Sequence, residues 1–129
     1  MSTGPDGLKI SRIGQIGITV HDLDRAVGFY RDVLKLNFLF QVPNLAFFDC
    51  GGVRLLLAAP ERPELDHPAS ILYYVVDDLP ASHAALRDAG ASLVDEPHLI
   101  AKLPDHELWM FFVNDEEGNT LGLMAEVRE

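Results

Sequence analysis

Residues 15–30 read QIGITVHDLDRAVGFY and join a strand pattern directly to a helix pattern. The segment Ile13 to Val20 is rich in β-branched residues, which favour strands. Asp22 is a good N-cap for a helix, and apolar residues then recur at helical spacing: Leu23, Ala26, Val27, Tyr30, Val33 and Leu34. The stretch therefore predicts a β-strand followed at once by an amphipathic helix.

Three short strands are expected after this helix. Lys35 suits the last helical turn, and Asn37 can take the left-handed conformation that ends a helix. The predicted strands cover about 37–42, 45–50 and 53–58, because the pairs Pro43-Asn44 and Gly51-Gly52 supply turns between them. The first half of the chain therefore has the order strand–helix–three strands.

The same order recurs in the second half. Residues 60–69, PERPELDHPA, hold three prolines and four charges and are typical of a linker. The VHDL sequence at 20–23 matches VDDL at 76–79, and each lies at a predicted strand-to-helix junction. A strand over 71–76 and a helix from Asp78 to Gly90 are followed by strands at about 91–95, 107–113 and 120–125.

The repeat predicts an α+β fold with two βαβββ modules in tandem, whose curved mixed sheet surrounds a cleft. We expect a mobile N-terminal tail over residues 1–12 and a single domain over 13–129. Within the domain, the first module covers about 13–59, the linker 60–69 and the second module about 70–126.

Composition narrows the classes of partner. Ten basic residues against twenty acidic ones give a formal net charge of −10, which repels nucleic acid and anionic membranes. No apolar run approaches the roughly 18–20 residues of a membrane span. A single cysteine and an N-terminus without the apolar core of a signal peptide favour the cytoplasm. We expect a small-molecule partner, with no nucleic acid and no membrane.

Three stretches resemble the vicinal oxygen chelate superfamily, which includes glyoxalases, bleomycin resistance proteins and extradiol dioxygenases. They are QIGITVHDLDRAVGFYRDVL, YYVVDDLPASHAAL and FFVNDEEGNTLGLM, and the resemblance extends from about Ile13 to Glu126. Enzymes of this superfamily hold a divalent metal in the cleft, with one ligand from the first and one from the last strand of each module. The superfamily hosts many activities, so the resemblance implies the fold more strongly than a function.

Carried over by position, the four metal ligands fall on Gln15, Leu56, Ile71 and Gly122. Only Gln15 offers a donor, and one neutral amide oxygen is a poor substitute for the carboxylate and imidazole ligands that a divalent cation needs. We therefore expect a degenerate site with no bound metal and no cofactor. Gln15 either faces the cleft and hydrogen-bonds a ligand or is satisfied by neighbouring backbone.

A cleft that has lost its metal ligands becomes apolar and suits a partly apolar small molecule. Its predicted ligand-binding residues are Gln15, Phe48, Leu56, Ile71, Tyr73, Trp109 and Gly122. The first hypothesis is thus a metal-free small-molecule-binding protein, which we expect to form a homodimer as relatives commonly do.

The segment PHLIAKLPDHELWMFF suggests an alternative. If His98 and His106 flank a loop, their imidazoles could face each other near the cleft mouth, and with Glu107 they are candidates for general acid–base catalysis. The protein would then be a metal-independent lyase or isomerase, whereas a solvated surface loop is the simpler explanation. A metal-dependent glyoxalase-like enzyme with a non-standard site is the remaining alternative.

Overall fold

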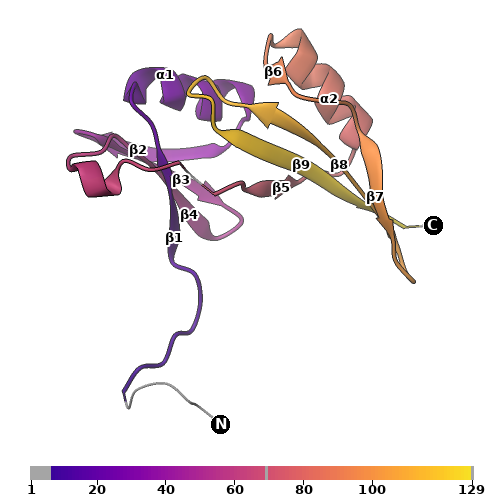
Figure 1. Cartoon of the computed structure of the whole chain (residues 1–129), viewed down its shortest axis with the longest axis horizontal. Coiled ribbons are helices and arrows are strands. Elements are labelled where there is room, and N and C mark those ends of the chain that lie inside the picture. The colour runs from indigo at the N-terminus through magenta and orange to yellow at the C-terminus, as the bar shows by residue number, and fades with distance from the viewer. Residues whose placement is uncertain (1–6, 69, 129) are drawn as a thin grey trace.

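The computed structural model describes residues 7–68 and 70–128 and divides their strands between two mixed sheets (Figure 1). The first sheet has the order β1-β4-β3-β2, in which β1 is parallel to β4 and the other neighbours are antiparallel. Its strands are β1 (Gln15–Thr19), β2 (Asn37–Val42), β3 (Leu45–Cys50) and β4 (Val53–Ala58). All four expected strands of the first half are present.

The second sheet repeats this plan with the order β5-β9-β8-β6, and β7 also pairs with β8. Here β5 is parallel to β9, as β1 is to β4. The strands are β5 (Tyr73–Val75), β6 (Ser92–Leu93), β7 (His98–Lys102), β8 (Glu107–Asn114) and β9 (Thr120–Val127). The predicted α+β fold with two βαβββ modules is confirmed.

Each module contributes one helix, and both helices lie on the same side of the sheets (Figure 1). Helix α1 (Leu23–Gly28) continues into a π-helical segment η1 (Phe29–Val33), and α2 covers Leu79–Asp88. The Asp22 carboxylate accepts a hydrogen bond from the Arg25 N–H, and the Asp78 carboxylate accepts one from the Ala81 N–H. The matching VHDL and VDDL sequences therefore mark equivalent helix starts.

The apolar core lies between the helices and the sheets. Strand alternation directs Ile18 and Val20 of the first module inward, as it does Leu121 and Leu123 of the second. The largest fully buried side chains are Tyr30, Phe48, Phe111, Leu57, Val20 and Val113, and they come from both modules. One core cluster thus spans the two halves of the chain.

Several local expectations differ from the structure. Lys35, with a φ of 61°, takes the left-handed conformation expected at Asn37, because the helical segment ends earlier and Asn37 already starts β2. The segment after 95 was expected to be a loop, yet residues 98–102 form β7 by pairing with β8. The strand is defined by this pairing across a short turn, where Lys102 lies opposite Glu107, and not by a pattern within residues 98–102.

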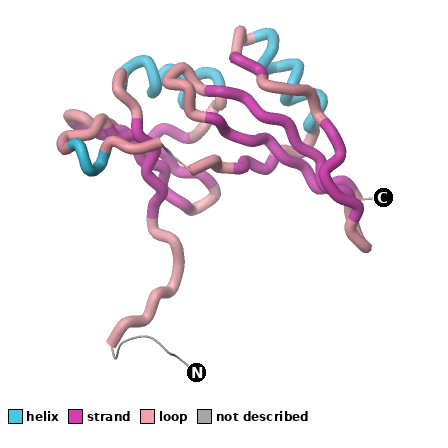
Figure 2. Tube along the Cα trace, in the orientation of Figure 1, coloured by secondary structure: helices cyan, strands magenta, loops and turns pink. Residues whose placement is uncertain are grey.

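The tail and the linker were predicted from composition. Of the tail predicted over 1–12, residues 1–6 lie outside the described residues, and residues 7–12 form no helix or strand and are exposed. In the linker, Pro63–Leu65 form a single 3-10 turn, and residue 69 lies outside the described residues (Figure 2). No helix in the described ranges is long and apolar enough to span a membrane.

A buried carboxylate joins the two modules. Asp115, 5% exposed, accepts a hydrogen bond of 2.8 Å from the hydroxyl of Tyr30 in the first module. It also accepts backbone N–H groups of Glu117 and Asn119 at 2.8 Å each, which fixes the β8–β9 turn. Burial, followed by the adjacent Asp115 carboxylate, raises the pKa of the Tyr30 hydroxyl and keeps it a donor.

The same turn contacts the start of α1 on the surface. The Glu117 carboxylate accepts hydrogen bonds from the N–H groups of His21 and Asp22 at 2.9 and 2.8 Å. The His21 ring lies 3.2 Å from Glu117 and 2.9 Å from the linker residue Asp66. His21 therefore connects the first module, the linker and the second module.

We expect Tyr30→Phe to lower the free energy of unfolding by about 1–3 kcal/mol, because it leaves a buried carboxylate oxygen of Asp115 without its phenolic donor. Urea unfolding of the wild type and the variant at pH 7 would measure the loss. A difference within about 0.5 kcal/mol, the usual range for neutral surface changes, would mean that the bond does not hold the modules together.

We also expect the contribution of His21 to stability to depend on pH. The hydrogen bond and charge of Asp66, with help from Glu117, raise the pKa of His21 in the folded state. A raised folded-state pKa stabilises the fold fully below the unfolded value of about 6.5, and this contribution is lost as the pH rises through the folded-state value.

The stability difference between the wild type and His21→Gln should therefore be largest near pH 5.5 and shrink towards pH 9, as measured by urea midpoints. His67→Gln is the matched control, since the His67 ring is bonded to the Pro68 carbonyl and not to a carboxylate. A difference that stays constant over this pH range would contradict the ion-pair assignment.

Candidate functional site

The open face of the first sheet carries two of the positions that the family resemblance assigns to metal ligands. Gln15 is opposite Arg54 and Gly17 is opposite Leu56 in the β1–β4 register, so Gln15 and Leu56 lie on neighbouring strands with the same orientation. Gln15 is exposed and Leu56 is half-buried. The structure thus brings these two side chains together on the face away from α1.

The other two positions belong to the second sheet. Gly122 is opposite Tyr73 in the β5–β9 register, and Ile71 precedes β5 with 47% of its surface exposed. A Cβ atom added to Gly122 would lie 2.7 Å from Cδ2 of Tyr73 and 3.4 Å from Phe112. The Tyr73 ring, which packs edge-on against Phe112, therefore fills the space where a side chain at position 122 would project.

The residues at the four positions do not fit a divalent cation. Leu56, Ile71 and Gly122 have no donor atom, and Gln15 offers a single neutral amide oxygen. A longer side chain at Gly122 would first have to displace Tyr73. Across residues 7–68 and 70–128, no three side chains of His, Cys, Asp or Glu are grouped so that they could hold a metal ion.

Phe48 and Trp109 lie on the opposite face from the remaining predicted ligand-binding residues. Phe48 is fully buried and packs against Tyr30 and Phe38 in the core. Trp109 packs against the core and lines a groove of about 460 Å³ beside Pro80 at the start of α2. Alternation within β3 and β8 sends both rings to the helix side, so the open face that carries Gln15 and Gly122 does not include them.

The candidate acid–base residues are not gathered in one site. His98 is the first residue of β7 and His106 lies in the turn after this strand, and the two rings have different partners: the Glu96 carbonyl for His98 and the Asp105 carboxylate for His106. The His106 ring is 13% exposed, with Nδ1 2.8 Å from Asp105. Glu107 accepts a hydrogen bond of 3.0 Å from the Trp109 indole N–H.

An apolar pocket of about 570 Å³ lies at the junction of the two modules, on the helix-facing side of the sheets. The first module contributes Ile16, Leu34, Leu36, Cys50, Gly51, Val53 and Leu55, and the second contributes Leu72, Tyr73, Tyr74, Val75, Val76 and Leu123. Tyr73 is the one predicted ligand-binding residue among them. The volume is within the range of roughly 300–1,000 Å³ that small-molecule sites occupy.

Two polar groups stand out in this apolar lining. The hydroxyl of Tyr74 is buried and has no hydrogen-bond partner among the described residues. Burial, followed by the neighbouring Cys50 and Asp115, raises the pKa of this hydroxyl, so it stays protonated at neutral pH. Burial and then Asp49 likewise raise the pKa of the Cys50 thiol, which makes it a poor nucleophile.

The junction pocket involves both faces of the segment 71–76, whereas the sequence analysis selected ligand-binding residues from one face. Alternation along 71–76 separates Ile71, Tyr73 and Val75 from Leu72, Tyr74 and Val76. The position carried over from metal enzymes belongs to the first set, whereas the junction pocket is lined by Tyr73 and Val75 of that set and by all three residues of the second. The alternation of this segment indicates Tyr74 as a possible site residue. It gives no indication that Leu34 and Leu36, which follow the helical segment, line the same pocket.

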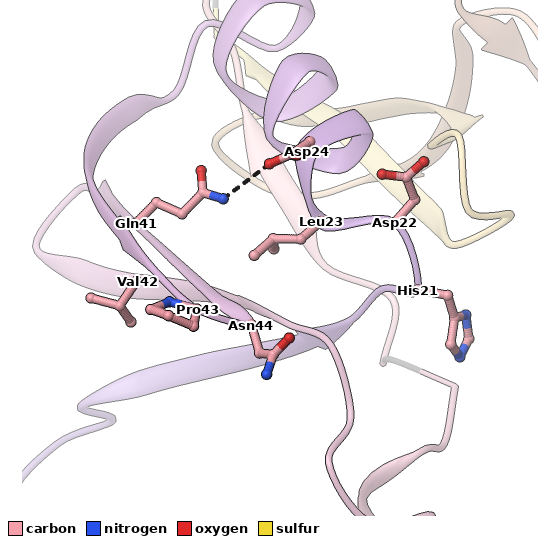
Figure 3. Close-up of a pocket in the computed structure, with 8 residues that line it drawn as sticks. All are labelled: His21, Asp22, Leu23, Asp24, Gln41, Val42, Pro43 and Asn44. Atoms are coloured by element: carbon pink, nitrogen blue, oxygen red, sulfur yellow. Dashed lines mark hydrogen bonds between the residues drawn. The ribbon is translucent and has the colours of Figure 1, made fainter.

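A second, more polar groove lies between the start of α1 and the β2–β3 hairpin, with a volume of about 710 Å³ (Figure 3). The Gln41 side chain donates a hydrogen bond of 3.1 Å to Asp24 across it. In Figure 3, Leu23 points into this groove, whereas the His21 ring and the Asp22 carboxylate point away from it. Its polar groups are therefore engaged with protein partners, unlike the Tyr74 hydroxyl.

Comparison with protein families and with solved structures identifies the family and the fold of the chain. Residues 12–123 match the family model described as "Glyoxalase/Bleomycin resistance protein/Dioxygenase superfamily". A lactoylglutathione lyase from Agrobacterium tumefaciens has 23% identity and a TM-score of 0.69, with 91% of this chain and 95% of that chain covered. A superfamily member from Sphaerobacter thermophilus has 19% identity and a TM-score of 0.75, with 92% and 100% covered. At such identities these structures show the shared fold.

We expect the purified protein to retain no stoichiometric metal after exposure to cobalt, nickel, manganese or zinc and subsequent dialysis, because the four inherited positions supply one neutral donor. Mass spectrometry of metal content would test this. The variant Gln15→Ala is the control for weak adventitious binding at that donor. One tightly held ion per chain would show that another group of residues forms a metal site.

Proposed function

The chain belongs to the Glyoxalase/Bleomycin resistance protein/Dioxygenase superfamily, and from this premise we propose that it is a binding protein for a small, partly apolar molecule and uses no divalent metal. The observation that carries the proposal is the apolar pocket of about 570 Å³ at the module junction. Burial of apolar ligand surface there would supply the main free energy of binding, at roughly 25 cal/mol per Å² before the losses of association.

The position of the pocket supports this proposal. Its walls come from both modules, so the fold creates it only when the modules are docked. Val75 and Tyr73, which line the pocket, are 70% and 47% exposed, so apolar surface at the pocket is open to solvent. Large exposed apolar side chains around a concave apolar site are typical of a surface that binds a ligand or a partner.

The open face remains a separate prediction. Gln15, Leu56, Ile71 and Gly122 lie outside the pocket lining, and a role for them in ligand binding stays a prediction, as does the homodimer. Tyr73 connects the two regions, because its ring covers Gly122 on the open face and also lines the pocket. A ligand in the pocket would therefore reach the positions that the family resemblance assigns to metal ligands only through Tyr73.

The acid–base alternative has weaker support. His106 is held by Asp105, and its hydrogen bond lowers the pKa of the Asp105 carboxyl, but neither residue lines the junction pocket. His98 lies at the other end of β7.

We expect the neutral fluorescent probe N-phenyl-1-naphthylamine to bind saturably, with one site per chain, and Val53→Glu to weaken this binding at least tenfold. Val53 lines the pocket and is half-buried, so a carboxylate there would lose hydration when the probe binds. A tenfold loss corresponds to about 1.4 kcal/mol. Fluorescence titration measures both affinities.

Val94→Glu is the matched control, because Val94 is 54% exposed and is absent from the pocket lining. It should bind the probe as the wild type does. The proposal fails if the wild type shows no saturable binding, or if Val53→Glu and Val94→Glu bind equally well.

A further inference from the structure

We propose that a second site, the groove beside the start of α2, binds a small organic cation with an aromatic body. This α2 groove has a volume of about 460 Å³ and is lined by residues 77–80 together with Pro97, Trp109, Ala125 and Val127. It shares no lining residue with the junction pocket, so the proposal goes beyond the proposed function and does not depend on it.

The apolar part of the α2 groove is open to solvent. Leu79 and Ala125 are buried and Trp109 is half-buried, whereas Pro80 is exposed and Val127 is 49% exposed. A ligand can therefore reach this surface directly. The groove is also large enough for a small molecule, since such sites occupy roughly 300–1,000 Å³.

Two carboxylates complete the lining, and they are not equivalent. Asp78 accepts a hydrogen bond of 3.0 Å from the Ala81 N–H and so compensates the positive end of the α2 dipole. Asp77 is exposed, and its carboxylate forms no hydrogen bond or ion pair within the described part of the chain. Because the lining holds no Lys, Arg or His, the formal negative charge of Asp77 faces the groove without a counter-charge.

The basic residue that follows Val127 is engaged elsewhere. The Arg128 guanidinium lies 2.9 Å from the Glu126 carboxylate and 3.8 Å from that of Asp105. Neither carboxylate lines the α2 groove, and alternation along β9 places Glu126 on the opposite face from Ala125 and Val127. A positive charge at Asp77 would therefore have to come from a ligand.

Trp109 favours a ligand that is both aromatic and cationic. Its indole N–H donates to the Glu107 carboxylate at 3.0 Å, so the one polar group of the ring is already paired. The ring then offers apolar surface, and aromatic rings also attract organic cations. An aromatic body against Trp109 and Pro80, with its charge towards Asp77, would satisfy both parts of the groove. An anion of the same shape would be repelled, as it would by the net charge of −10.

Trp109 is the only tryptophan of the chain, so its indole N–H gives a single resonance in a ¹⁵N–¹H NMR titration. The probes are (naphthalen-2-ylmethyl)trimethylammonium, neutral 2-naphthalenemethanol and anionic 2-naphthylacetate at pH 7.5 and low salt. We expect the cation to shift this resonance saturably and to bind about 5-fold more tightly than the alcohol, with the anion weakest. An alcohol that binds as tightly as the cation, or a resonance that none of them shifts, would overturn the proposal.

Asp77→Asn should weaken binding of the cation about threefold and leave the affinity for the alcohol within about twofold of the wild type. Asp88→Asn is the matched control, because it removes the same formal charge from the other end of α2, outside the groove. Equal losses in the two variants would mean that the net charge of the protein, and not this groove, attracts the cation.

Two further outcomes concern other sites and other occupants. Val53→Glu, which alters the junction pocket, should bind the cation as the wild type does, and a loss of binding there would assign the cation to that pocket instead. The Trp109 resonance should also be independent of protein concentration without a probe. A shift on concentration would mean that a second copy of the chain covers the groove, which would overturn the proposal.

Discussion

The buried carboxylate of Asp115 is the constraint on which the arrangement of the two modules depends. It is the one buried charged side chain among the described residues, and four donors surround it: the N–H groups of Glu117 and Asn119, the Asn119 amide and the Tyr30 hydroxyl. A buried charge is tolerated only when hydrogen bonds compensate its lost hydration. The turn that supplies these donors is thereby fixed in shape and attached to the first module.

Other residues of the β8–β9 turn also form hydrogen bonds to the first module. Asn119 also donates to the Thr19 carbonyl at 3.2 Å, and Glu117 binds the N–H groups of His21 and Asp22. Partial burial raises the pKa of Glu117, but the hydrogen bonds from Asp22 and His21 outweigh this effect and the net pKa is lowered. The end of β1 and the start of α1 are thus bonded to the second module, and the junction pocket results from that docking.

The two faces of β5 then have different chemistry. On one face, the Tyr73 ring lies over Gly122, one of the positions that the family resemblance assigns to a metal ligand. On the other face, Tyr74 lines an apolar pocket, while its hydroxyl is buried and has no hydrogen-bond partner among the described residues. The fold therefore keeps a concave site between its modules while the donors that a cation needs are missing, which is consistent with the general independence of fold and function.

The sequence by itself determined most of the secondary structure and the chemistry of the four positions that the family resemblance assigns to metal ligands. The strands at 37–42, 45–50 and 53–58 and the helix caps at Asp22 and Asp78 follow from local periodicity and short-range hydrogen bonds, which need no distant partner. The lack of donors at Leu56, Ile71 and Gly122 is likewise a property of residue identity.

Only the tertiary structure decided the remaining features of the fold and of the candidate site. The strand at 98–102 depends on pairing with β8 across a short turn, and this pairing also fixes the positions of His98 and His106. The burial of Phe48 and the unpaired hydroxyl of Tyr74 depend on packing between segments far apart in sequence, because docking of the modules sets which groups meet and which face water.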